Sequence, residues 1–268
     1  MPTEPSPIGR HHALLTEFRR VFKAGPIEGG LLAIEGPRLI GEALRSGYRI
    51  QKILFSQGGL EHHGTKLLPQ VSKHATAGVA DDRSFASAMD SEHPQGVAAL
   101  VEYVPASLEQ AFGDGTAPAL VALAAGLQDP GNLGTLLRAA DAFGATGLVA
   151  LTDTVSPFHA KAVRASAGSV FHYPVVAKAS AAEVIAACEA RGVALLAASA
   201  RAGAGPAGRL DGPICLIIGQ EAAGVPRELQ RAATATIEIP MAREIESLNA
   251  GVAGAILLYE AARQRAGR

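Results

Sequence analysis

The sequence contains no long hydrophobic run, little cysteine and almost no net charge. No run approaches the roughly 18 apolar residues that a membrane-spanning helix needs. Residues 1–7 also lack the basic start and apolar centre of a signal peptide, so we expect a cytoplasmic protein. The two cysteines, Cys188 and Cys215, lie in apolar stretches without CxxC spacing, which predicts buried free thiols and neither a disulfide nor a metal site.

An excess of positive charge is also missing, because the formal net charge is −1. A dedicated nucleic-acid binder is often strongly basic, since phosphate contacts come from lysine and arginine. RNA is still possible as a partner, because the location of basic groups matters more than their sum. Arg19, Arg20 and Lys23 form one such cluster and are candidate RNA contacts. A solvated helix face explains this cluster equally well.

The chain has 268 residues, of which 48% are hydrophobic, enough for about two domains with real cores. Its first part alternates between helical and strand-like patterns, which predicts a small α/β domain over 1–103. The expected helices lie near 12–23, 37–45 and 60–72, and the expected strands at 31–35, 50–55, 75–80 and 96–104. Residues 104–118 are rich in glycine and proline and indicate a linker.

From residue 119 onward the strand-like runs are almost wholly apolar, which is typical of strands buried on both faces of a mainly parallel sheet. These runs are 119–125, 147–151, 193–198 and 214–218, and helical patterns at 132–143, 180–191 and 247–264 separate them. The fold class is therefore α/β, with a second domain over 119–268. In the last helix, Leu248, Val252, Ile256 and Tyr259 are spaced as one continuous apolar stripe.

Three segments of this second part place polar groups and glycines directly after apolar runs, as expected where strand ends form a ligand site. They are 127–134 with Arg138 beyond it, 217–225, and 239–241 followed by 247–249. Each has an ordinary interpretation by itself: a Pro-Gly turn with an asparagine cap, a strand-to-helix connection, and helix caps. Arg138 is expected over the turn at Gly134, near helix amides that suit a phosphate.

In this order and at these intervals, the three segments resemble the motifs of the SpoU (TrmH-like) branch of the SPOUT RNA methyltransferases. The resemblance covers 119–268 and includes 165–168 and 171–175. It implies a trefoil-knotted α/β domain that binds S-adenosylmethionine, acts as a homodimer and methylates a ribose 2′-hydroxyl of RNA. Periodicity alone would not suggest a knot, because threaded chains are nearly absent from proteins.

The resemblance also implies which residues form the site. The catalytic motif positions fall on Asn132, Arg138, Glu221, Ser247 and Asn249, and the cofactor-binding positions on Ala198, Ser199, Gly219, Ile239, Met241 and Leu248. Residues 249–252 read Asn-Ala-Gly-Val where many relatives have Asn-Val-Ser-Val, a difference that affects packing more than chemistry.

Arg138 needs a role that a guanidinium can fill. Within the family an arginine has been assigned as the base, yet a guanidinium is very hard to deprotonate in a protein. Our hypothesis is that Arg138 clamps the target phosphate and stabilises developing negative charge, while the other four motif residues order the site.

The N-terminal part resembles, over 32–44, the substrate-binding domain that precedes the catalytic domain in ribosomal-RNA members, a fold shared with a large-subunit ribosomal protein. This resemblance favours ribosomal RNA over transfer RNA. Arg38 follows Gly36-Pro37 and is a candidate RNA contact at a helix start, although a strand-to-helix turn with a solvated arginine has equal weight.

Two other patterns are weaker indications of function. Residues 203–208 match GxGxxG, but 209–213 cannot start the helix that a dinucleotide site requires, so we expect a surface loop and disfavour a nicotinamide-dependent enzyme. His11-His12 and His62-His63 are adjacent residues that point in different directions, so we assign no metal. The remaining alternative is a catalytically silent RNA-binding or ribosome-assembly factor on the same fold.

Overall fold

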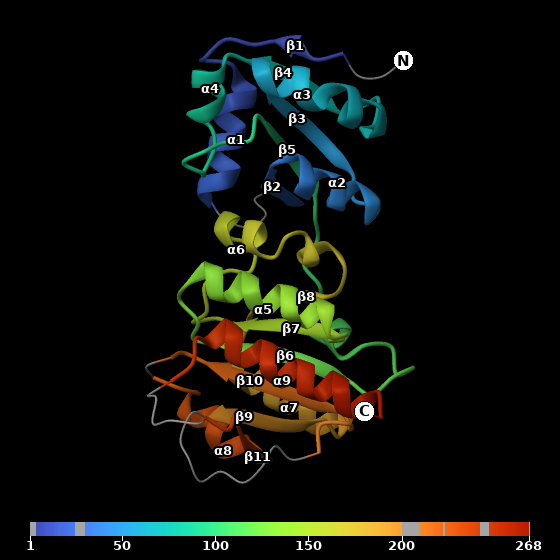
Figure 1. Cartoon of the computed structure of the whole chain (residues 1–268), viewed down its shortest axis with the longest axis vertical. Helices are drawn as coiled ribbons and strands as arrows, with labels where there is room; N and C mark the ends of the chain where they lie inside the picture. The colour runs from blue at the N-terminus through green and yellow to red at the C-terminus, as the bar shows by residue number, and fades with distance from the viewer. Residues whose placement is uncertain (1–3, 25–29, 200–208, 222, 242–246, 268) are drawn as a thin grey trace. The chain divides into compact units, whose positions relative to one another are not determined.

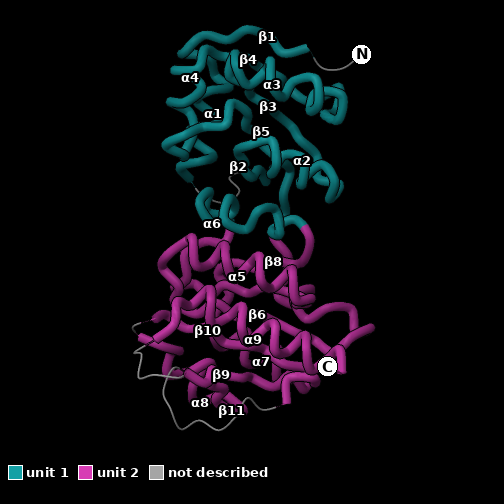
Figure 2. The backbone as a smooth tube through the Cα atoms, viewed as in Figure 1, with its two compact units in different colours: residues 1–104, 158–171 teal, residues 105–157, 172–268 magenta. Residues whose placement is uncertain are grey.

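The computed structural model describes residues 4–24, 30–199, 209–221, 223–241 and 247–267. By its internal contacts the chain divides into two compact units. Unit 1 contains residues 1–104 and 158–171, and unit 2 contains 105–157 and 172–268 (Figure 2). In the described part of the chain, no helix is long and apolar enough to cross a membrane.

Unit 1, as far as it is described, is built on a five-stranded sheet of order β1-β4-β3-β5-β2 (Figure 1). Its strands are β1 (Ser6–Pro7), β2 (Leu31–Glu35), β3 (Ile50–Ser56), β4 (Thr76–Ala80) and β5 (Val97–Glu102). Its helices are α1 (Ala13–Ala24), α2 (Pro37–Arg45), α3 (Gln57–Leu67), α4 (Asp82–Ala86) and α6 (Ala160–Ala165), with 3-10 turns η2 (Leu68–Gln70) and η4 (Ser169–Phe171). β5 runs antiparallel to both its neighbours, whereas β3 and β4 are parallel. Phe18 of α1 is fully buried in a core with Leu54 and Leu100 of the sheet.

The segment 158–171 interrupts the second half of the chain but belongs to unit 1. The ring of Tyr103 holds it there, with centroids 4.9 Å from Phe158 and 6.2 Å from Phe171. The Tyr103 hydroxyl also donates a 3.3 Å hydrogen bond to the carbonyl of Val170, and burial raises the pKa of this hydroxyl far above its usual value. A buried aromatic cluster therefore joins two segments that are distant in sequence.

Unit 2 contains, within the described residues, a six-stranded sheet of order β11-β9-β10-β6-β7-β8 in which all neighbours are parallel. The strands are β6 (Leu120–Ala125), β7 (Gly147–Leu151), β8 (Val175–Ala179), β9 (Ala194–Ser199), β10 (Ile214–Gly219) and β11 (Ala235–Glu238). The helices are α5 (Pro130–Ala142), α7 (Ala181–Arg191), α8 (Arg227–Ala232) and α9 (Ala250–Arg265), with the 3-10 turn η3 (Glu109–Phe112).

Helices cover both faces of this sheet, which explains its apolar strands. Leu123 and Ile217 share one core with Cys188 of α7 and Leu229 of α8. Against the other face, α5 and α9 pack side by side (Figure 1). Gly254 of α9 lies close to Ile218, which follows Ile217 in β10 and points to the opposite face of the sheet. The parallel α/β fold expected from the apolar runs is confirmed, and both cysteines are free and buried. The trefoil knot stays a prediction.

The structure differs from the sequence-based expectation in several short elements. The elements β1, β8, β11, α4 and α6 were not anticipated, because they are short or weakly apolar. The stretch expected as a linker carries η3, whose Ala111 is fully buried, and a Cβ on Gly147 would lie only 2.4 Å from the Ala111 Cα. Residues 105–118 thus belong to unit 2 by their contacts, while the boundaries 1–103, 104–118 and 119–268 stay a prediction.

The starts of α5 and α9 and the buried face of α9 also differ from what the sequence predicts. α5 begins at Pro130 with Asp129 as its N-cap, so Asn132 lies in the first turn and is not the cap. α9 begins at Ala250, three residues later than expected, because Asn249 is its cap. Its stripe of Val252, Ile256 and Tyr259 is exposed, whereas Gly254, Leu257, Leu258 and Ala261 form the buried face.

Candidate active site

A cavity of about 600 Å³, counting its solvent-open part, lies in unit 2 where β9, β10 and β11 end. Parallel strands all finish at the same edge of a sheet, so the loops that follow them converge there. The cavity is lined by Ala198, Ser199, Ile218, Gly219, Gln220, Glu221, Gly224, Ile237, Ile239, Met241, Ser247, Leu248, Ala250 and Ala253. Its size and its mixture of apolar walls with few polar groups are typical of a small-molecule site.

The wall formed by the end of β10 depends on two glycines. Gln220 and Gly224 form an isolated antiparallel bridge, and Gly224 has a φ of +71°, a backbone conformation that favours glycine. A Cβ on Gly219 would lie 2.4 Å from the carbonyl carbon of Gly224. The tight turn after β10 therefore needs glycine at both positions.

Three side chains from different segments form one hydrogen-bonded network at the rim of this cavity. Asn132 Nδ2 donates to Glu221 Oε1 at 2.6 Å, and Asn249 Nδ2 donates to Asn132 Oδ1 at 2.7 Å. Glu221 Oε1 also accepts from the backbone N–H of Ala250 at 3.1 Å. The network joins the start of α5, the end of β10 and the start of α9.

Local structure orients each member of this network. The Asp129 side chain accepts from the Asn132 N–H at 2.9 Å, which fixes the first turn of α5. Asn249 Oδ1 accepts from the Val252 N–H at 3.1 Å, so this residue both caps α9 and reaches Asn132 with its amide nitrogen. The carboxylate of Glu221 faces the positive end of α9, where negative charge is stabilised.

Arg138 lies elsewhere on α5. It is six residues beyond Asn132 on an exposed face, does not line the cavity, and makes no hydrogen bond or ion pair within the described residues. Among the described residues its guanidinium makes no hydrogen bond to the first-turn amides, and one of these, the Asn132 N–H, donates to Asp129.

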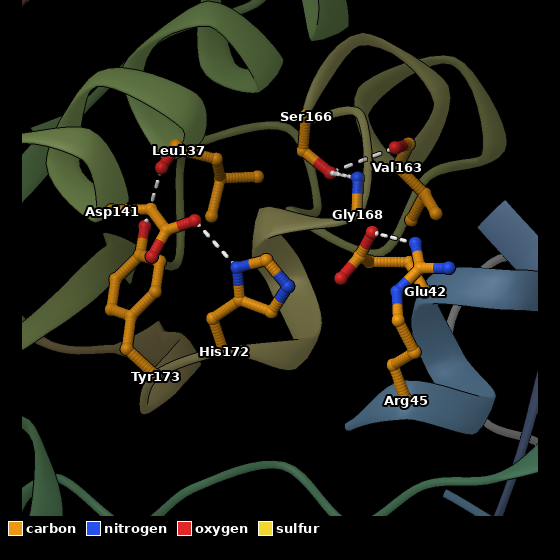
Figure 3. Close-up of polar contacts among 9 residues, drawn as sticks. All are labelled: Glu42, Arg45, Leu137, Asp141, Val163, Ser166, Gly168, His172 and Tyr173. Carbon is orange, nitrogen blue, oxygen red and sulfur yellow. Dashed lines mark hydrogen bonds and ion pairs between the residues drawn. The ribbon is translucent and has the colours of Figure 1, made fainter. Parts of the chain in front are cut away.

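Two other residues of α5 contact the segment 172–173 (Figure 3). His172 Nδ1 lies 2.6 Å from Oδ2 of Asp141, and the Tyr173 hydroxyl donates to the Leu137 carbonyl at 2.9 Å. These two contacts anchor residues 172–173 to α5. Both residues belong to the stretch 171–175 that resembles the family, whereas their partners on α5 are not evident from the sequence.

The structure brings most of the anticipated site residues together. Of the residues expected around the cofactor, Ala198, Ser199, Gly219, Ile239, Met241 and Leu248 all line the cavity, together with Glu221 and Ser247. The lining residues that the sequence analysis missed are Ile218, Gln220, Gly224, Ile237, Ala250 and Ala253. They adjoin the anticipated positions in the same segments, and this adjacency was the available signal. The chemical roles of all these residues stay predictions.

The candidate RNA contacts in unit 1 have different environments. Arg19 donates from Nε to the Ser87 carbonyl at 3.1 Å and from Nη2 to Ser87 Oγ at 2.7 Å, so its guanidinium already fastens α1 to the end of α4. Arg20, Lys23 and Arg38 are exposed.

Among the described residues, no group of three or more His, Cys, Asp or Glu side chains is placed to hold a metal ion. The GxGxxG match at 203–208 lies outside the described residues.

Comparison with known proteins connects this geometry to a family. The sequence model of the SpoU rRNA methylase family matches residues 119–259. The chain belongs to this family. A second model, the MRM3-like substrate binding domain, matches residues 27–99, which agrees with the expected N-terminal substrate-binding domain.

Relatives match most of the chain. A protein of Bacillus subtilis described as 23S rRNA (guanosine(2553)-2'-O)-methyltransferase RlmP is 31% identical over 228 residues, covering 84% of this chain and 86% of that protein. A 23S rRNA (uridine(2479)-2'-O)-methyltransferase of Streptomyces viridochromogenes is 32% identical over 247 residues, covering 88% of this chain and 84% of that protein.

Solved structures of SpoU members also align over nearly the whole chain. An rRNA methyltransferase from Sinorhizobium meliloti with bound AdoMet has a TM-score of 0.81 and 29% identity, covering 97% of this chain and 98% of that one. The SpoU methyltransferase AviRb from Streptomyces viridochromogenes, in complex with the cofactor AdoMet, has a TM-score of 0.77 and 26% identity, covering 96% and 100%.

Proposed function

We propose that this chain transfers a methyl group from S-adenosylmethionine to a ribose 2′-hydroxyl in ribosomal RNA. The observation that carries the proposal is the network of Asn132, Glu221 and Asn249, which joins three SpoU motif segments at the rim of one cavity. Family membership and the activities named for the relatives support the same reaction. The match of residues 27–99 to a substrate binding domain supports binding of the RNA substrate by unit 1.

The residues of the cavity fit S-adenosylmethionine. Ile218, Ile237 and Leu248 provide apolar walls for an adenine ring, while Ser199 and Ser247 offer hydroxyl groups. The missing Cβ of Gly219 lets the backbone approach a ligand closely. When bound, S-adenosylmethionine supplies an electrophilic methyl group on its sulfonium. Ala198, Ser199, Gly219, Ile239, Met241 and Leu248 are the residues that hold it in this proposal.

The protein contributes position and electrostatics. The 2′-oxygen forms a bond to the methyl carbon as the bond from that carbon to sulfur breaks, its electron pair stays on sulfur, and the hydroxyl proton passes to solvent water. Holding the acceptor oxygen in line with the methyl group lowers the activation barrier by several kcal/mol. In this proposal Asn132, Glu221, Ser247 and Asn249 order the acceptor side of the cavity, and Arg138 binds the target phosphate as a two-pronged donor.

The functional unit in this proposal is a homodimer formed through α9. Of the large apolar side chains exposed in the described part of the chain, three lie on this helix: Val252 at 45%, Ile256 at 39% and Tyr259 at 53%. The ring of Phe143 at the end of α5 packs against Tyr259 with centroids 5.6 Å apart and extends the patch. A second copy can cover such a stripe with its own, because a two-fold interface uses the same surface twice.

Mapping ribose methylation on ribosomal RNA by mass spectrometry tests the function. RNA from cells that contain the protein is expected to carry one 2′-O-methyl group that is missing when its gene is deleted and that returns with a plasmid copy. Calorimetry with S-adenosylmethionine separates the enzyme from a catalytically silent assembly factor. Absence of both cofactor binding and a methylation difference would contradict the proposal. The cytoplasmic location stays a prediction.

A further inference from the structure

A groove between α2 and α3 of unit 1 collects basic side chains. It is lined by Pro37, Arg38, Gly41, Arg45, His63, Lys66, Leu67 and Gln70. None of the lining residues carries a carboxylate, although acidic residues outnumber lysine and arginine in the chain by 25 to 24. The groove is therefore a local concentration of positive charge on a nearly neutral protein, and charge distribution decides which partner a surface attracts.

Helical spacing explains why these residues face one another. Arg38, Gly41 and Arg45 are three and four residues apart along α2, so they share one face of that helix. His63 and Lys66 are three apart on α3 and share a face in the same way. Gly41 adds no side chain between the two rows, and Arg45 Nη1 would lie 3.4 Å from a Cβ placed on it. Cations therefore line the groove from both helices.

Internal ion pairs neutralise little of this charge. Arg45 pairs with Glu42 on its own helix, as Figure 3 shows. In the described ranges of the chain, neither Arg38 nor Lys66 has a carboxylate or another hydrogen-bond partner for its charged group. The guanidinium of Arg38, with five N–H donors, and the ammonium of Lys66, with three, are therefore available to a ligand beside the charge of Arg45.

We propose that this groove binds backbone phosphates of the RNA substrate and so positions the RNA. The proposal rests on the proposed function. Arginine matches a phosphate with a forked pair of donors and lysine binds it as a point charge. No phenylalanine, tyrosine or tryptophan lines the groove, so it has no ring of that kind on which a base could stack. Its contribution is therefore to affinity and orientation and not to reading the base sequence. Arg38 was anticipated from the sequence, whereas Arg45, His63 and Lys66 are additions.

The test measures binding of a 23S ribosomal RNA transcript to the full chain over a range of salt concentrations. The variant Arg38→Gln with Lys66→Gln is expected to bind about tenfold or more weakly at low salt. The slope of log affinity against log salt should fall by about 1.4, since each lost phosphate contact on a single strand removes about 0.7. Calorimetric binding of S-adenosylmethionine should not change, because the cavity is in unit 2.

The matched control is Lys73→Gln with Arg83→Gln, which removes two exposed cations of unit 1 that do not line the groove. It is expected to retain most of the affinity and the salt slope. Equal losses in both double variants, or no loss in the groove variant, would overturn the groove while leaving the proposed function intact. A wild-type chain that binds the cofactor but no RNA would overturn both. Lys66→Arg, which keeps the charge, should bind normally and shows that the position tolerates substitution.

Discussion

Asn132, Glu221 and Asn249 are separated by 89 residues in one pair and by 117 in another, yet their side chains form one hydrogen-bonded network. Each residue taken alone has an ordinary local explanation. Asn249 is a helix cap, Asn132 lies in a first turn and Glu221 follows a strand. The network explains why the three motif segments occur together, because the geometry of each depends on the other two.

Replacing Glu221 with glutamine is expected to reduce methylation by at least about tenfold, because charge-assisted hydrogen bonds are about twice as strong as neutral ones. Stability should fall by less than about 1 kcal/mol, since the residue is exposed and mainly loses its charge beside the start of α9. Single-turnover methylation and thermal unfolding measure the two effects. Glu228→Gln, in the first turn of α8, is the matched control and should retain activity.

Arg138→Lys keeps the charge of Arg138 but removes its fork, so the phosphate clamp predicts a clear loss of methylation with unchanged cofactor affinity. Turnover with the RNA transcript is the measurement. Arg231→Lys, an exposed arginine of α8, serves as the control. Near-normal turnover of the Arg138 variant would rule out a bidentate role.

At the scale of elements, the site depends on where strands and helices end. β10 ends at Gly219, and the bridge between Gln220 and Gly224 turns the chain back so that Glu221 reaches the start of α9. The beginnings of α5 and α9 are capped by Asp129 and Asn249, each of which accepts a hydrogen bond from a backbone N–H of the first turn that has no partner within its helix.

Gly219→Ala tests this turn. A Cβ there would meet the backbone of Gly224 at 2.4 Å, so the strand end must shift. We expect a loss of about 1–3 kcal/mol in unfolding free energy, as is usual for overpacking, together with weaker binding of S-adenosylmethionine. Thermal unfolding and calorimetry measure these effects. Gly212→Ala, where a Cβ meets nothing within 4 Å, should behave as wild type. Unchanged cofactor affinity in Gly219→Ala would separate this turn from the cofactor site.

At the scale of the whole molecule, α9 has two different faces. Its buried face contains Gly254, Leu257, Leu258 and Ala261, and a Cβ on Gly254 would lie 2.4 Å from Leu136 Cδ1 of α5. On its other face, the side chains of Val252, Ile256 and Tyr259 are exposed. An outward apolar stripe on a well-packed helix is typical of a surface that is covered by a partner.

Ile256→Glu is expected to convert a dimer into a monomer, because the partner would have to bury an unpaired carboxylate. Sedimentation velocity reports the mass, and methylation should decline together with the dimer fraction. Val104→Glu makes the same change at a side chain that is 84% exposed and not on α9, and it should leave the mass unchanged. A wild-type chain that sediments as a monomer at micromolar concentration would contradict the dimer.

Local sequence patterns were sufficient for the longer elements and for the family. β2 and α2 have the predicted limits 31–35 and 37–45, because an apolar run and a proline in the first helical turn are signals within a few residues. β7 matches 147–151 for the same reason. Most cavity-lining positions could also be named, because each motif segment carries its residues in a fixed order after a buried strand.

Only the tertiary structure decided which side chains meet. The partnership of Glu221 with Asn132, the packing of 158–171 around Tyr103 and the groove between α2 and α3 all join residues that no local pattern connects. Short elements such as α6 and the exposed edge strand β11 were missed because they span too few apolar positions for a period to emerge. Periodicity identified the stripe of α9 but not its direction, because the choice of the buried face depends on the elements that pack against the helix.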